Sequence, residues 1–235
     1  MAKSTAKTPS GITPSPRERI IDALLGLAGE MRWDQIALPM IAAKAEVSLA
    51  DLRDQFPSKG AILGGFAKRI DRIVLNGTSP DMLGEPARER VLDIIMRRLD
   101  ALQPYKQGLR EIRAATRRDP LMLAALNQLA LNSWRYMLAA ADIDTEDGLG
   151  LVRIQGAALV FVRTLDTWFD DEGADLSRTM AKLDKELGKG EKIMGRFEDF
   201  GRFAAPLRGM VRAMMERRPG RSSRADTAGR EAGSF

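Results

Sequence analysis

Apolar residues recur at intervals of three or four positions through most of the chain, which is the spacing of one face of an α-helix. The first such stretch spans residues 17–30, with Ile20, Leu24 and Leu27 on one side. No segment alternates between apolar and polar residues over the length of a strand. We therefore expect an all-α fold. Beyond the first stretch, helices are expected over two short segments before residue 56 and over residues 59–75, 86–102, 104–118, 120–141, 144–169 and a segment that starts after Asp175.

The two short helices carry recognisable end signals. Pro39 suits the first turn of a helix, and Ser48 followed by Asp51 resembles a capping box at the start of the next one. Apolar side chains from both helices and their turn can close one small core: Ile41, Ala45, Val47, Leu52 and Phe56. This arrangement is typical of a helix-turn-helix, whose second helix fits the DNA major groove. The outward side of that second helix would consist of Leu49, Ala50, Asp51, Arg53 and Asp54.

This region resembles the TetR family of bacterial transcription regulators. The residues that carry the resemblance lie within 17–75 and match without a gap: Ile41-Ala42, Val47-Ser48, Leu52, Phe56 and Lys59. The resemblance implies a three-helix DNA-binding domain over 17–75 and a larger helical domain over 80–218 that binds an effector and dimerises. Three positions depart from the family, which has Gly at Glu46, Tyr at Arg53 and His at Gln55.

We expect double-stranded DNA to be the partner of this N-terminal domain. Lys59 starts a helix, where its ammonium and the exposed backbone N–H groups would together hold a phosphate. The alternative is that Asp51, Arg53 and Asp54 form an ordinary solvated face of a helix-turn-helix that no longer binds DNA. The candidate DNA-binding residues are Ser48, Leu49, Ala50, Asp51, Arg53 and Lys59.

The larger half is expected to form a homodimer. The segment 146–169 has two apolar sides, one for the core and one for a partner. Two-fold pairing would place two reading helices roughly 34–36 Å apart, which predicts a nearly palindromic operator. One interpretation of this half is a pocket for a small apolar or lipid-like effector, with Arg163 and Asp166 placed to orient its polar head. The candidate pocket residues are Met122, Trp134, Met137, Phe161 and Trp168, although large side chains at helical spacing more often simply fill a core.

A second resemblance competes with the first. Trp168, Asp170-Asp171 and the run from Thr179 to Asp184 are similar to the TetR-like lipid-binding accessory proteins of ubiquinone biosynthesis. This resemblance implies a protein that does not bind DNA and uses an aromatic pocket. An amphipathic helix over 191–218 would then contact a membrane surface, although packing on the protein itself or a dimer contact suits that helix equally well.

Composition narrows the function further. The chain has no Cys and no His, which removes the commonest catalytic bases, thiol nucleophiles and metal ligands. We expect no enzyme activity, cofactor or metal site, and we interpret Asp170-Asp171-Glu172 as a solvated acidic cluster.

The net charge of +5 divides into +3 for residues 1–75, −2 for 76–190 and +4 for 191–235. Segments 1–16 and 219–235 are interpreted as disordered tails, and without a leader or a spanning segment we expect a soluble cytoplasmic protein.

Overall fold

The computed structural model describes residues 14–78 and 80–195, and every regular element in that part is helical. The expected all-α fold is therefore confirmed. Three short 3₁₀ turns, η1 (Trp33–Gln35), η2 (Pro80–Gly84) and η3 (Gln103–Tyr105), link the longer helices. These are α1 (Pro16–Glu30), α2 (Leu38–Lys44), α3 (Leu49–Gln55), α4 (Lys59–Asn76), α5 (Ala87–Leu102), α6 (Lys106–Thr116), α7 (Pro120–Ala140) and α8 (Gly150–Phe169), followed by helical residues 177–195.

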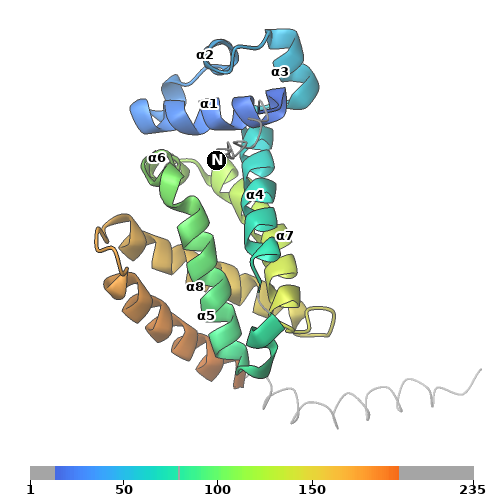
Figure 1. The fold of residues 1–235 in the computed structure, drawn as a ribbon, viewed down its shortest axis with the longest axis vertical. Helices are drawn as coiled ribbons and strands as arrows, with labels where there is room; N and C mark the ends of the chain where they lie inside the picture. Colours follow the sequence, from blue (N-terminus) through green and yellow to red (C-terminus); the bar gives the residue numbers. More distant parts are fainter. Residues whose placement is uncertain (1–13, 79, 196–235) are drawn as a thin grey trace, which may run out of the picture. The chain divides into compact units, whose positions relative to one another are not determined.

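Helices α1, α2 and α3 lie together, and α4 runs from them alongside α7 (Figure 1). Ser15 caps α1, because its side chain accepts a hydrogen bond from the backbone N–H of Glu18. The small core expected from the sequence is present, with Ile41 fully buried and Leu52 and Phe56 each 2% exposed. These residues hold α2 and α3 against α1, so the outer side of α3 remains free.

The other helices enclose a second set of buried side chains. Helix α7 packs against α4 and α8, and α6 packs closely against α1. Trp134, Met137 and Trp168 are fully buried among these helices. Helix α6 therefore links the three-helix end to the rest of the described chain.

Several predicted boundaries differ from the structure. The predicted 144–169 helix begins only at Gly150, because Asp144 and Asp147 accept backbone hydrogen bonds in the preceding turns. The predicted 104–118 helix shortens to α6, since Gln103–Tyr105 form a 3₁₀ turn. Pro16, assigned to the N-terminal tail, belongs to α1. The predicted 219–235 tail and most of the predicted 191–218 helix lie outside the described residues.

The sequence analysis interpreted Asp170-Asp171-Glu172 as a solvated acidic cluster, and for Asp171 this interpretation was wrong. Asp171 is only 2% exposed. Its carboxylate accepts hydrogen bonds from the backbone N–H and the hydroxyl of Thr179, each at 2.8 Å, and these bonds lower the pKa of Asp171. Asp171 therefore anchors the start of the helical segment 177–195. Among the described helices, none combines the length and apolar character that a bilayer crossing requires.

A buried carboxylate in the same segment predicts an acid-sensitive component of stability. Glu186 is 2% exposed and accepts hydrogen bonds from Lys189, Lys182 and Arg163. These cations, led by Lys189, lower the pKa of Glu186 to about 2. Because the folded pKa lies below the unfolded one, the stabilisation is complete above about pH 4.5 and disappears as the pH falls towards 2. We expect Glu186→Gln to reduce stability at pH 7 and to flatten this acid-side loss in urea titrations. Glu172→Gln, at an exposed position, should leave the pH profile unchanged, and equal profiles for all three proteins would contradict the expectation.

Candidate nucleic-acid interface

The turn between α2 and α3 has the hydrogen bonds of a Schellman motif. The backbone N–H of Glu46 donates to the carbonyl of Ala43 at 3.2 Å, and that of Val47 donates to the carbonyl of Ala42 at 3.0 Å. Glu46 therefore adopts a left-handed conformation, with φ of 53°. The TetR family has Gly at this position. Gly adopts a left-handed conformation without strain, whereas Glu46 is strained in it.

Replacing Glu46 with Gly should relieve this strain. We expect Glu46→Gly to be more stable than Glu46→Ala by about 1 kcal/mol, because both lose the side chain but only Ala keeps a Cβ in the left-handed region. The ion pair with Arg19, absent from both variants, spans 3.9 Å at a Glu46 side chain that is 86% exposed, so its removal costs little and equally in each. Chemical denaturation of the two variants measures the difference, and an Ala variant as stable as the Gly variant would disprove it.

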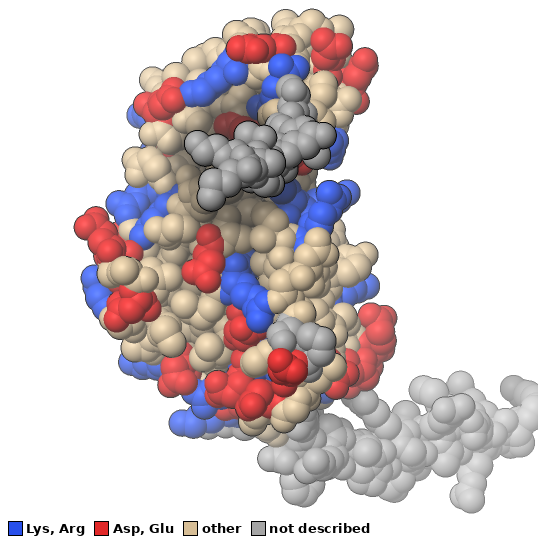
Figure 2. Space-filling view, in the orientation of Figure 1, with Lys and Arg blue, Asp and Glu red and all other residues tan. Residues whose placement is uncertain are grey.

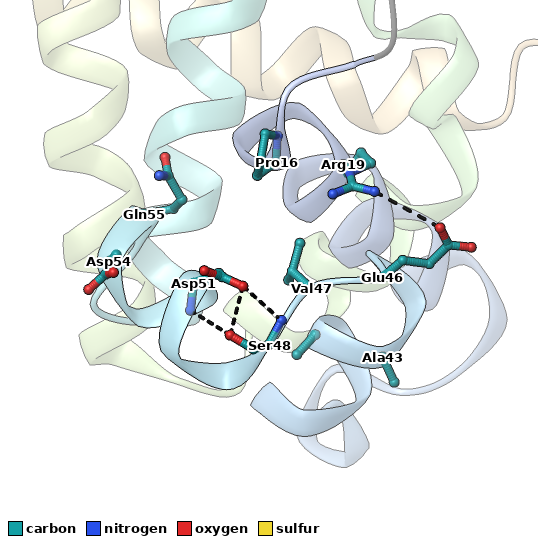
Figure 3. A pocket seen from close by; sticks show the side chains of 10 residues that line it. Pro16, Arg19, Ala43, Glu46, Val47, Ser48, Asp51, Asp54 and Gln55 are labelled. Carbon is teal, nitrogen blue, oxygen red and sulfur yellow. Dashed lines mark hydrogen bonds and ion pairs between the residues drawn. The ribbon is translucent and has the colours of Figure 1, made fainter.

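A complete capping box starts α3, as the sequence predicts (Figure 3). The Ser48 hydroxyl accepts from the backbone N–H of Asp51 at 3.0 Å and donates to its carboxylate at 2.7 Å. That carboxylate also accepts from the backbone N–H of Ser48 at 3.2 Å, and these bonds lower the pKa of Asp51. The charge of Asp51 is therefore directed at the helix N-terminus, where the helix dipole favours it.

The outer side of α3 is open to solvent. Leu49 is 51% exposed, and Ala50, Arg53, Asp54 and Gln55 are exposed as well. Arg53 has no hydrogen bond or ion pair with any described residue, whereas most cations of the surrounding helices are engaged. Arg19 pairs with Glu46, Arg32 with Asp34, Lys44 with Glu30, and Arg69 with Asp22.

Lys59 is placed differently from the sequence expectation. Its ammonium donates to the carbonyls of Trp33 and Ile36, at 3.0 and 2.8 Å, and lies 4.7 Å from the centre of the Trp33 ring. Partial burial lowers the pKa of Lys59. The side chain thus ties the start of α4 to η1. A phosphate contact by Lys59 stays a prediction, and it would compete with these internal bonds.

The surface around α3 carries both charge signs. In Figure 2 acidic and basic side chains alternate over the end formed by α1–α3. Between these helices lies a hollow of about 420 Å³, seen closely in Figure 3, with Arg19, Glu46, Ser48 and Asp54 in its wall. Sequence-independent attraction to phosphate is therefore modest here, so individual contacts from α3 matter more.

A separate, mainly apolar cavity of about 370 Å³ lies among α4–α8. Of the predicted pocket residues only Phe161 belongs to its wall. Trp134, Met137 and Trp168 are fully buried core residues, and partly buried Met122 packs against the core. Arg163 and Asp166 are also absent from the wall, but Asp166 binds the wall residue Arg113. Sequence reasoning missed the wall residues of α4, α5 and α6 because periodicity does not separate a filled core from a void.

Two known proteins similar to this chain are described as transcriptional regulators, although no family model matches the chain. It is 29% identical over 129 residues to the HTH-type transcriptional repressor KstR of Rhodococcus jostii, covering 54% of this chain and about half (52%) of that relative. It is 24% identical over 175 residues to the HTH-type transcriptional regulator AlkX of Mycobacterium tuberculosis, covering 71% of this chain and 72% of the relative. A crystal structure of a TetR transcriptional regulator from Nitrosomonas europaea superposes with a TM-score of 0.60 at 23% identity, covering 74% of this chain and 97% of that one. The resemblance to the TetR family and the fold class expected from the sequence are thus confirmed.

Proposed function

We propose that this chain, which has the fold of TetR-family transcriptional regulators, is itself a DNA-binding transcriptional regulator. In this proposal it acts as a homodimer that represses transcription from a nearly palindromic operator until an effector binds. The observation that carries the proposal is the open outer side of α3, whose start is fixed by the capping box of Ser48 and Asp51. Arg53, in the last turn of this helix, has no partner among the described residues. The two relatives, both described as HTH-type transcriptional regulators, support the same function.

The role of each α3 residue follows from its environment. Arg53 donates to a phosphate or to a guanine, the two acceptors that guanidinium groups recognise best in DNA. Leu49 and Ala50 contact base edges or thymine methyl groups, and Ser48 faces the sugar-phosphate backbone. Asp51 acts indirectly, because its carboxylate already serves the capping box and keeps α3 in place.

Pairing of two copies would use apolar side chains that the described part of the chain leaves exposed. Leu151 of α8 is 65% exposed and Met180 is 43% exposed, and neither belongs to the wall of the cavity among α4–α8. A face of this kind is typical of a helical dimer interface. Sedimentation of the chain should give a dimer, and Leu151→Glu should shift it towards the monomer without altering the cavity wall.

Regulation would act through the cavity among α4–α8. An occupant that favours one arrangement of these helices would change the spacing of the two α3 helices and so the fit to DNA. The cavity volume of about 370 Å³ lies in the range of small-molecule sites. The second resemblance, to lipid-binding accessory proteins, has no support among these relatives, which are transcriptional regulators.

Footprinting on the DNA upstream of the chain's own gene tests the proposed arrangement. We expect two protected patches on the same side of the duplex, about one helical turn apart, centred on a nearly palindromic sequence. A single protected patch would contradict the dimer. Absence of any protection at low salt would contradict the DNA-binding role.

A further inference from the structure

The wall of the cavity among α4–α8 is mainly apolar, and the charges among its described residues are all positive. Apolar side chains dominate it, among them Leu63, Ile70, Leu102 and Leu165. The charged residues among the described wall residues are Arg98 and Arg113, and both are cations. An apolar chamber whose charges have a single sign selects for an apolar molecule that carries the opposite charge.

Arg98 has an unused hydrogen-bond donor inside the protein. The residue is 7% exposed, and its Nε is buried without a hydrogen-bond partner among the described residues. Another guanidinium nitrogen donates to the Asp71 carboxylate at 2.6 Å, and the guanidinium lies 5.5 Å from the centre of the Phe161 ring. Buried donors are rarely left unpaired, because the lost hydration is not replaced. Since a guanidinium has five N–H donors, Arg98 can serve Asp71 and one further acceptor at once.

Arg113 contributes surplus positive charge. It shares the single carboxylate of Asp166 with Arg117, at 3.3 and 2.8 Å. With Arg98 matched one to one by Asp71, the two clusters together carry one more cation than anion. The uncompensated charge favours an anionic group at the wall.

We propose that the cavity binds an apolar molecule with one carboxylate, such as a medium-chain fatty acid, and that Arg98 receives the carboxylate with Arg113 as a secondary cation. The apolar side chains of α4, α6 and α8 enclose the hydrocarbon part. The inference rests on the proposed function only where it concerns regulation, that is, the effect of the bound carboxylate on DNA binding. The binding itself is measured without DNA.

Calorimetry on the full chain with laurate, below its micellar concentration, tests the ligand class. We expect laurate to bind, and methyl laurate and dodecyltrimethylammonium to bind at least about tenfold more weakly, since they keep the chain but lose or reverse the charge. An ester or a cation that binds as tightly as laurate would overturn the proposal, as would absence of laurate binding.

Three variants test the residues. Arg98→Met should weaken laurate binding at least about tenfold and leave the ester unaffected. Arg113→Gln should also weaken laurate binding, but less than Arg98→Met does. If Arg98→Met does not fold because Asp71 has lost its ion pair, Arg113→Gln alone tests the assignment. Arg97→Met is the matched control, because Arg97 lies on the same helix but pairs with Asp93 and is absent from the wall. Wild-type laurate affinity in folded Arg98→Met or in Arg113→Gln would contradict the assignment.

Binding of upstream DNA, measured separately without laurate, distinguishes the two proposals. DNA binding without laurate binding would overturn only the inference about the cavity. Laurate binding without DNA binding would support that inference and overturn the proposed function.

Discussion

Arg53→Ala should weaken binding to the operator by about 1–3 kcal/mol, which is roughly five- to 150-fold in affinity, as removal of a good guanidinium contact does. The reason is that Arg53 is exposed on α3 and is not engaged by any described residue, so its full donor capacity is available to DNA. Fluorescence anisotropy with the footprinted duplex measures the change in affinity. If Arg53 contacts phosphate, the slope of log affinity against log salt should also fall by about one unit for each phosphate that the variant no longer neutralises.

Arg72→Ala is the matched control for this experiment. It removes the same charge from an exposed position on α4, so the net charge of the chain changes equally while α3 stays intact. We expect it to change affinity far less than Arg53→Ala. Equal losses of affinity in both variants would show that only net charge matters and would contradict a direct contact by Arg53.

Gly108→Ala should destabilise the protein by about 1–3 kcal/mol, the usual cost of overpacking. A Cβ at Gly108 would lie 2.5 Å from the backbone carbonyl oxygen of Leu25, which belongs to α1, so the helices α6 and α1 must separate. For a chain of this size, each 1 kcal/mol corresponds to a fall of roughly 2–4 °C in the thermal midpoint. Circular dichroism during heating measures the shift.

Gly60→Ala provides the comparison. Gly60 is also helical, but a Cβ there would only contact the Ser58 hydroxyl oxygen at 3.7 Å. We expect an unchanged or slightly higher midpoint for this variant, because Ala favours the helix. A Gly108→Ala protein that melts at the same temperature as Gly60→Ala would contradict the tight α1–α6 packing.

Local signals predicted the three-helix end well. Ser48 and Asp51 are three residues apart, and the structure has the complete capping box between them. The inward positions of Leu52 and Phe56 followed from helical spacing and are confirmed by their burial. Both features depend on residues within a few positions of each other, which is why the sequence alone was sufficient.

Long-range contacts were not predictable in the same way. Lys59 bonds to carbonyls of η1 and its C-terminal flank, more than twenty positions away, and no local pattern indicates which backbone oxygens will be close. Trp134 and Trp168 have the spacing of a pocket wall and of a core alike, and only packing of the helices places them in the core. The cavity wall instead includes Arg98 and Arg113, which a hydrophobic pattern treats as surface positions.

The most direct test of the central claim is the affinity of the full chain for its own upstream DNA, compared with a scrambled duplex, across a salt series. We expect a specific complex that is roughly 10³-fold or more tighter than the complex with the scrambled duplex. The logarithm of the specific affinity should fall linearly with the logarithm of the salt concentration. Equal affinity for the two duplexes, or no complex with either at low salt, would contradict the central claim.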